Sequence, residues 1–193
     1  SRRNALDERG AGMSVDIAVI DYGAGNLRSI RRALEAAGAT VTVTADAETV
    51  LAADAVVFPG VGAAGAAMQR LRDLDLISPI HDVVAQERPF LGICLGMQLL
   101  FEEQEEGSTR GLGLLQGRVR SLSSEVKVPQ IGWNRTLWVQ DGAGSRAGES
   151  GDFYFVHSYI AEPESPDDIL AVSRYGEVFP SIVRHGHIWG TQF

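Results

Sequence analysis

The single cysteine of the chain, Cys94, stands between two glycines in the segment Gly92-Ile93-Cys94-Leu95-Gly96. This spacing, after an apolar run and before a helical stretch, is typical of a nucleophile elbow, here with cysteine in the usual place of serine. The strand must turn sharply into the helix, and a Cβ at position 92 or 96 would crowd that turn. We therefore predict Cys94 as a catalytic nucleophile at the top of a sheet.

The predicted elbow has consequences for the chemistry of the thiol. A helix N-terminus favours the thiolate, so we expect the pKa of Cys94 to be lowered. The free amide of Leu95 is expected to point to the place where an oxyanion forms. The alternative is a buried, inert cysteine, which is what most lone cysteines in apolar surroundings are. The strand, the two glycines and the helix together favour the nucleophile.

A second glycine cluster, Pro59-Gly60-Val61-Gly62, follows an earlier apolar run. Its bare backbone could offer amides to an oxyanion or hold a substrate beside the elbow. Gly60, Gly62 and Gly65 also match the spacing of a dinucleotide fingerprint, but that motif closes the first strand and needs an acidic residue ending the next. Here the cluster follows the third predicted strand, and the next strand, at residues 90–93, has no acid. We therefore expect oxyanion or substrate contacts rather than a dinucleotide.

Four histidines are candidates for the general base that a cysteine nucleophile requires: His81, His157, His185 and His187. His157 could face the nucleophile from its strand, although a structural role is the stronger expectation for it. His185 and His187 flank a turn glycine and could chelate a metal, but no third ligand accompanies them, so no metal site is expected. The sequence marks none of the four as a convincing base.

Strands and helices alternate in the part of the chain that carries the glycine motifs. Apolar runs bounded by turn residues predict strands at residues 15–20, 40–44, 55–58 and 90–93. Helical spacing predicts helices at residues 27–37, 47–53, 64–72, 77–86 and 95–104, with Asn26 as the cap of the first. Such alternation is typical of an α/β fold, a mostly parallel sheet with helices on both faces. Ligands of such sheets bind at the carboxyl edge, where Cys94 would lie.

The pattern changes after Gly107. Strands joined by Gly, Ser, Pro and Asp turns are predicted at residues 117–122, 135–139, 152–157, 169–172, 181–184 and 188–192. We expect this C-terminal part to be strand-rich and antiparallel and to extend the edge of the sheet. The acidic run from Glu102 to Glu106 is expected to be the solvated end of a helix, and Arg28, Arg31 and Arg32 a solvated helix face.

Length and composition indicate one soluble domain. The chain has 193 residues, 45% of them apolar, which is enough to bury a sizeable core. A net charge of −8, from 17 basic and 25 acidic residues, argues against nucleic acid or an anionic membrane as a partner. A lone cysteine forms no internal disulfide, and no signal peptide or membrane-spanning run is visible, so we expect a cytoplasmic protein. Residues 1–12 are expected to be a tag or a disordered extension, and Met13 the natural start.

The nucleophile motif, read on through Met97 and Gln98, resembles that of the triad (class I) glutamine amidotransferases. Four further segments resemble, within that family, the glutaminase subunits of imidazole glycerol phosphate synthase, an enzyme of histidine biosynthesis: residues 21–27, 59–62, 129–134 and 154–159. The resemblance covers residues 15–193. It implies a type 1 glutamine amidotransferase domain at residues 13–193, with the family's flavodoxin-like core.

The resemblance also implies a reaction. Cys94 would attack the side-chain amide of glutamine, form a γ-glutamyl thioester and release ammonia. The other residues implied at the site are Gly60, Val61, Gly62 and Leu95 at the oxyanion hole, and Gln98, Ser158 and Tyr159 on the amino acid portion of glutamine. Asn26 would lie near a (β/α)₈ cyclase subunit, through whose barrel the ammonia travels. That subunit makes imidazole glycerol phosphate and an aminoimidazole carboxamide ribotide, and no cofactor is implied for the glutaminase.

The chain departs from the family pattern at two places. Gln130 stands where the family often has histidine, which we interpret as a tolerated variation. The family follows Gly-Thr-Gln-Phe with His-Pro-Glu, whose His and Glu complete the triad, whereas the sequence stops at Phe193. We expect the natural chain to continue with that His and Glu. The alternatives are a stand-alone Cys hydrolase of γ-glutamyl substrates and a catalytically incomplete regulatory subunit of the same fold.

Overall fold

The computed structural model describes residues 14–23 and 25–193, so the predicted N-terminal extension and the predicted start at Met13 lie outside the described residues. The first half of the chain forms β1 (Asp16–Ile20), α1 (Leu27–Ala36), β2 (Thr40–Thr44), α2 (Ala47–Ala52), β3 (Ala55–Gly60), α3 (Ala64–Asp73), α4 (Ile77–Ala85), β4 (Phe90–Cys94) and α5 (Leu95–Gln98). The second half forms β5 (Phe101–Gln104), β6 (Thr109–Arg110), β7 (Leu115–Ser121), β8 (Gln130–Trp138), β9 (Ser150–His157), β10 (Tyr159–Pro163), β11 (Ile169–Tyr175), β12 (Glu177–His185) and β13 (Ile188–Thr191).

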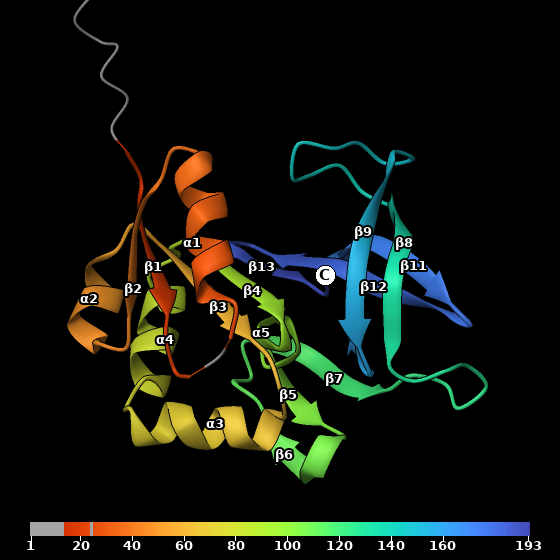
Figure 1. The fold of residues 1–193 in the computed structure, drawn as a ribbon, viewed down its shortest axis with the longest axis horizontal. Coiled ribbons are helices and arrows are strands. Elements are labelled where there is room, and N and C mark those ends of the chain that lie inside the picture. Colours follow the sequence, from red (N-terminus) through yellow and green to blue (C-terminus); the bar gives the residue numbers. More distant parts are fainter. Residues whose placement is uncertain (1–13, 24) are drawn as a thin grey trace, which may run out of the picture.

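One large sheet runs through the whole molecule in the order β2-β1-β3-β4-β13-β12-β11-β8-β9 (Figure 1). The strands from β2 to β13 pair in parallel, and the strands from β12 to β9 pair antiparallel. The predicted α/β fold with a parallel core and an antiparallel C-terminal part is therefore confirmed. The last strand, β13, is an exception, because it pairs in parallel with β4 from Ile188–Phe90 to Thr191–Ile93.

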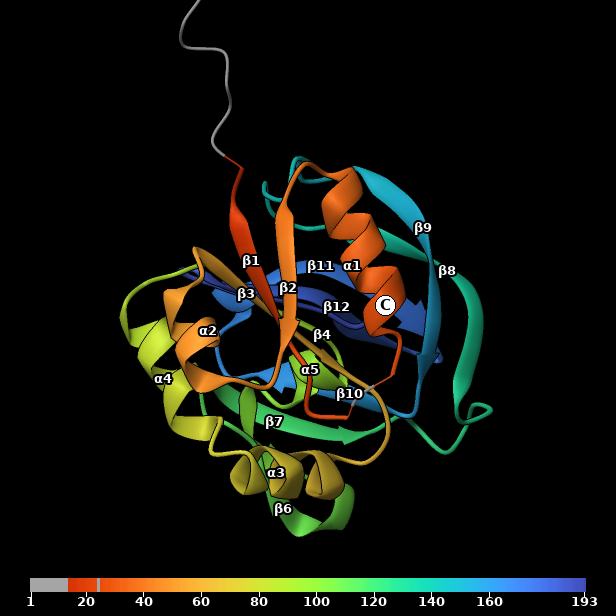
Figure 2. The same cartoon turned by 60° about the vertical axis from the view of Figure 1, so that its left-hand side comes forward.

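Helices cover both faces of the parallel strands, as predicted (Figure 2). On one face, α1 packs its partly buried Leu27, Ile30 and Leu34 against valines of β1, β2 and β3. On the other face, α2, α3 and α4 pack against a core that includes Phe58 and Phe90. Strands that are apolar on both faces belong in the centre of such a sandwich, so the continuous apolar runs of β3 and β4 are explained by burial from both sides. Among the described residues, no helix has the length and apolar character needed to cross a membrane.

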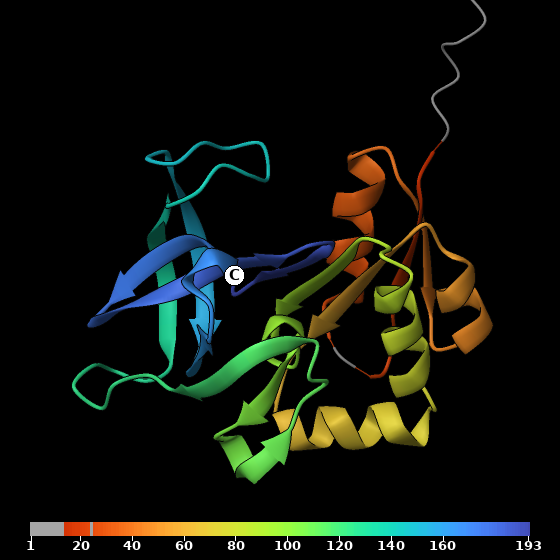
Figure 3. The same ribbon diagram turned by 180° about the vertical axis from the view of Figure 1, so that it is seen from behind.

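A second, smaller sheet has the strand order β10-β7-β5-β6 and lies between α3 and the antiparallel strands (Figure 3; β5, β6 and β7 in green). It corrects the prediction of a helix at residues 95–104, because α5 ends at Gln98 and the chain re-enters a strand at Phe101. Leu99, Leu100 and Phe101 are all fully buried. Three consecutive buried side chains do not fit one face of a helix, and the carbonyl of Leu100 instead accepts amides from the start of β7.

Candidate active site

The turn at Cys94 has the geometry of a nucleophile elbow. Cys94 ends β4 with φ 55° and ψ −115°, and α5 begins at the next residue. A Cβ at Gly92 would lie 2.6 Å from the carbonyl oxygen of Gly96, and a Cβ at Gly96 would overlap the carbonyl oxygen of Phe58. Both glycines are therefore required by close backbone approach, which confirms the steric argument made from the sequence.

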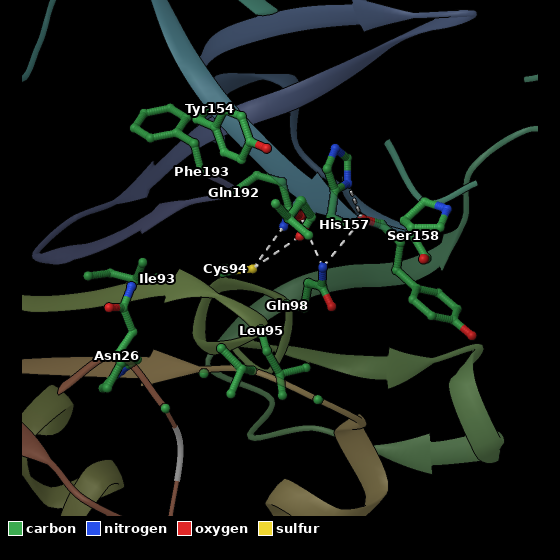
Figure 4. Close-up of a pocket in the computed structure, with 18 of the residues that line it drawn as sticks. Asn26, Ile93, Cys94, Leu95, Gln98, Tyr154, His157, Ser158, Gln192 and Phe193 are labelled. Carbon is green, nitrogen blue, oxygen red and sulfur yellow. Dashed lines mark hydrogen bonds between the residues drawn. The ribbon is translucent and has the colours of Figure 1, made fainter. Parts of the chain in front are cut away.

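The thiol of Cys94 lies between two polar groups from distant strands. Its sulfur is 3.9 Å from the carbonyl oxygen of Val156 and 3.8 Å from the side-chain amide nitrogen of Gln192 (Figure 4). Burial raises the pKa of the thiol, and hydrogen bonds from the Leu95 amide and from Gln192 offset this only in part. The sequence-based expectation of a lowered pKa was wrong in direction. The helix that follows Cys94 has only four residues, and desolvation of the sulfur outweighs it.

A cavity of about 560 Å³ opens over the thiol. The predicted site residues that line it are Asn26, Gly60, Val61, Gly62, Cys94, Leu95, Gln98, Ser158 and Tyr159. They come from the position before α1, from the end of β3 and the loop after it, from the β4–α5 elbow and from the junction between β9 and β10. Asn26 and Tyr159 are more than 130 positions apart along the chain. The structure therefore brings together every residue that the sequence placed at the site.

The cluster Pro59-Gly60-Val61-Gly62 lies directly beside the elbow. Gly60 is paired opposite Cys94 in the parallel ladder, so β3 continues two residues further than predicted. A Cβ at Gly60 would lie 2.7 Å from the amide nitrogen of Gly96, which explains why a glycine is needed there. Beyond it, Gly62 has φ 89° and Val61 is half exposed at the cavity. The bare backbone of this loop faces the nucleophile from the neighbouring strand.

Glu106 is a cavity residue that the sequence did not single out. The run from Glu102 to Glu106 was expected to be a solvated helix end, and this was wrong, since it forms β5 and a 3₁₀ turn. The Glu106 carboxylate lines the cavity and accepts a 2.8 Å hydrogen bond from the amide of Ala64, the first residue of α3. Burial and the nearby Glu106 and Glu105 carboxylates raise the pKa of Tyr159.

A buried pair of amide side chains forms one wall of the cavity. Gln98 donates to the side-chain oxygen of Gln192 at 3.1 Å and to the backbone oxygen of Tyr159 at 3.3 Å (Figure 4). Gln192 thus connects Gln98 to the sulfur of Cys94. The sequence did not mark Gln192, because its role depends on β13 lying next to β4, and only that parallel pairing brings it to the elbow.

His157 lines the cavity but is occupied by structural hydrogen bonds, as predicted. Its Nδ1 lies 2.9 Å from the backbone oxygen of Tyr159, and its Nε2 lies 2.9 Å from the side-chain amide of Gln130. Burial lowers the pKa of the imidazole, which keeps it neutral at pH 7. His185 pairs with Asp168 outside this cavity. Within residues 14–23 and 25–193, no histidine is hydrogen-bonded to Cys94.

Asn26 occupies the position before α1 at the rim of the cavity. Its backbone is left-handed, with φ 68° and ψ 11°, and its side chain makes no capping hydrogen bond. The predicted capping role was therefore wrong. Asparagine tolerates this conformation better than most residues, which accounts for its place in the turn. Asn26 is also one of the residues that line the cavity.

Fold and site together define an enzyme that works through a cysteine nucleophile on the carboxyl edge of a parallel α/β sheet. The sequence model of the family described as "Glutamine amidotransferase class-I" matches residues 18–193. The chain is 46% identical over 182 residues to the imidazole glycerol phosphate synthase subunit HisH of Synechococcus elongatus, covering 92% of this chain and 84% of that protein. It is 48% identical over 179 residues to HisH of Aquifex aeolicus, covering 91% of this chain and 86% of that protein.

Among solved structures, one described as a glutamine amidotransferase superposes with a TM-score of 0.74 at 19% identity, covering 92% of this chain and 88% of that one. At that identity the likeness shows the shared fold. The chain therefore belongs to the class-I glutamine amidotransferase family and, within it, to the HisH subunits of imidazole glycerol phosphate synthase.

Proposed function

We propose that this chain is the glutaminase subunit of an imidazole glycerol phosphate synthase. It hydrolyses glutamine to glutamate and ammonia, and the ammonia passes to a (β/α)₈ cyclase subunit. That subunit makes imidazole glycerol phosphate and aminoimidazole carboxamide ribotide in histidine biosynthesis. The observation that carries the proposal is the convergence, in one cavity, of the Cys94 elbow, the Gly60–Gly62 backbone and the polar groups near Tyr159.

The reaction follows from the positions around the sulfur. The Cys94 thiolate attacks the amide carbon of glutamine, and the tetrahedral oxyanion accepts hydrogen bonds from the amide of Leu95 and from the loop that contains Val61. The carbon–nitrogen bond then breaks, and the nitrogen leaves as ammonia once it has been protonated. Water attacks the resulting γ-glutamyl thioester and releases glutamate. Two amides that both point at the same oxygen are the arrangement that stabilises such an oxyanion.

The amino acid portion of glutamine carries one positive and one negative charge, which the cavity must accommodate. Gln98, Ser158 and Tyr159 are the polar residues proposed to hold it. To these we add Glu106, because its carboxylate lines the cavity and is fixed by the amide of Ala64. A fixed carboxylate is the natural partner for the α-ammonium group, and such charged hydrogen bonds are stronger than neutral ones.

The general base is proposed to come from the His and Glu that follow Gly-Thr-Gln-Phe in the family pattern. Phe193 lines the cavity, so a residue directly after it would arrive near the thiol. An imidazole there would take the proton that burial otherwise keeps on sulfur. It would then protonate the leaving ammonia and deprotonate the hydrolytic water.

The cyclase is proposed to dock on the exposed apolar face of β8 and β9. Ile131, Trp133, Tyr154 and Val156 share one face of this strand pair and are all exposed, and Tyr154 and Val156 also line the cavity. Exposed apolar patches of this kind mark protein interfaces. Docking there, next to Asn26, would cover the mouth of the cavity.

The cytoplasm is the proposed location of the protein, because a reducing compartment keeps a lone cysteine as a free thiol.

Replacing Cys94 with Ala in the assembled synthase tests the proposed function. Glutamine-dependent synthesis should be abolished, because the nucleophile is lost. Synthesis from an added ammonium salt should remain at the wild-type rate, because the cyclase chemistry lies on the other subunit. Both assays are run on the same mutant complex, so the second is the folding and assembly control for the first. Glutaminase activity retained by the Cys94→Ala complex would exclude Cys94 as the nucleophile.

A further inference from the structure

Tyr22 is a buried tyrosine that contacts the proposed oxyanion loop from behind. It follows β1, is 4% exposed, and its ring lies 5.4 Å from that of Phe58 in β3. Its hydroxyl donates a 2.7 Å hydrogen bond to the backbone oxygen of Pro59. Burial and the neighbouring Cys94 raise the pKa of this hydroxyl, so it stays protonated and remains a donor throughout the neutral range.

The Tyr22 hydroxyl lies where Gly60 meets the residues that follow Cys94. A Cβ at Gly60 would meet the Tyr22 hydroxyl at 2.7 Å, the Gly96 amide nitrogen at 2.7 Å and the Leu95 Cβ at 2.8 Å. The Tyr22 oxygen therefore packs against Gly60 at the point where the loop meets the residues after Cys94. It is not among the residues that line the cavity, so its contact is with the loop and not with the substrate.

Two constraints meet at Pro59 and determine where the next peptide points. The pyrrolidine ring fixes φ of Pro59, and the hydrogen bond from Tyr22 holds its carbonyl group, which fixes ψ. Because the peptide is planar and trans, the amide of Gly60 must then point away from Tyr22. Rotation of the loop is thereby confined to Gly60, Val61 and Gly62, where the glycines make it easy.

We propose that Tyr22 is a positioning residue that anchors the Pro59–Gly60 peptide and so aims the following amides at the oxyanion. The inference rests on the proposed function, since it assigns the oxyanion to this loop. The loop that carries Tyr22 also passes close to the oxyanion loop further on, since a Cβ added at Gly25 would lie 3.5 Å from the side chain of Val61. Tyr22 thus connects the β1–α1 loop, which ends at the partner-facing Asn26, to the groups that stabilise the transition state.

The test is Tyr22→Phe, which keeps the ring against Phe58 and removes only the hydroxyl. Removing an oxyanion donor outright costs about 10²–10³ in kcat, and a donor left in place but less well aimed should cost less. We expect kcat for glutamine in the assembled synthase to fall about 10- to 100-fold, with KM changed less than twofold. Synthesis from ammonium should be unchanged. L-glutamate γ-semialdehyde, which forms an oxyanion-bearing adduct with the thiol, should bind more weakly by the same factor, whereas glutamate should not.

Tyr175→Phe is the matched control, since the Tyr175 hydroxyl also donates a 2.8 Å hydrogen bond to a backbone oxygen, that of Lys127, outside the cavity. It removes a hydroxyl of the same kind away from the elbow and should leave kcat unchanged. If Tyr22→Phe folds poorly, Pro59→Gly is the second variant. It frees the same peptide by removing the proline ring that fixes φ, and it should reproduce the kcat loss. A Tyr22→Phe kcat within twofold of wild type, or an effect on KM alone, would overturn the inference. Neither result would touch the proposed function, which fails only if the Cys94→Ala complex keeps its glutaminase activity.

Discussion

The chemistry of Cys94 depends on a balance between burial and hydrogen bonding at one sulfur atom. Burial raises its pKa, whereas the amides of Leu95 and Gln192 lower it by a smaller amount. A raised pKa means less thiolate at any given pH, so the described residues hold the nucleophile in its unreactive, protonated form. A catalytic base would then have to act at the moment when glutamine is bound.

Alkylation of the 193-residue chain by iodoacetamide measures this balance directly, because Cys94 is its only cysteine. The rate should rise with pH and reach its midpoint above about 8.5, the value of a free thiol. Gln192→Leu should move the midpoint further up, since it removes a hydrogen bond that favours the thiolate. Gln140→Leu, which removes an amide that binds the backbone near Ile169, should leave it unchanged. A midpoint below that of a free thiol would contradict the burial argument.

Glu106→Gln isolates the charge of the proposed ammonium site. The substituted amide oxygen can still accept the hydrogen bond from Ala64, so α3 keeps its contact while the negative charge is lost. Hydrogen bonds to charged groups contribute about 1.5–3 kcal/mol, so KM for glutamine should rise roughly 10- to 100-fold with little change in kcat. Glu102→Gln is the control, because Glu102 pairs with Arg110 on the surface and should have no effect. An unchanged KM in the Glu106 variant would remove Glu106 from the site.

At the scale of elements, the parallel half of the fold could be predicted because its signals are local. Short apolar runs between turn residues located β1 to β4 within two residues, and helical spacing located α1 to α4 equally well. The elbow could be predicted for the same reason, since two glycines at fixed spacing around a nucleophile act on the local backbone. The orientation of β13 could not, because pairing between strands distant in the chain leaves no local pattern.

The features that were missed depend on tertiary contacts. The helix predicted at residues 95–104 ends after one turn because the buried Leu99–Phe101 segment is needed in the core and in the second sheet. Glu106 was hidden in an acidic run, and only its contact with Ala64 distinguishes it from its neighbours. Gln192 and Tyr22 likewise owe their positions to strands that meet at the elbow. The predicted site residues all line the cavity, whereas Glu106, Gln192 and Tyr22 could be recognised only from their contacts in the folded chain.

At the scale of the whole molecule, the large sheet continues past the nucleophile and ends in an unpaired apolar face. Trp133 is 74% exposed and Ile131 61% exposed, and Trp133 packs edge-on against Tyr154 at 5.8 Å. On the opposite face of the same strands Phe155 is buried. Successive side chains of β9 therefore alternate between the core and the exposed apolar face. A large exposed aromatic side chain is the kind of group that dominates the affinity of an interface.

Trp133→Ala should therefore weaken assembly with the cyclase without altering the site itself. Truncating such an interface residue costs about 2 kcal/mol or more, so the cyclase concentration that half-activates glutamine turnover should rise at least about 30-fold. The rate at saturating cyclase should equal that of the wild type, because Trp133 does not line the cavity. Val178→Ala, at an exposed valine on β12 outside the cavity, is the control and should leave the titration unchanged. An unshifted titration for Trp133→Ala would place the docking face elsewhere, and fast glutamine turnover without any cyclase would instead favour a stand-alone hydrolase.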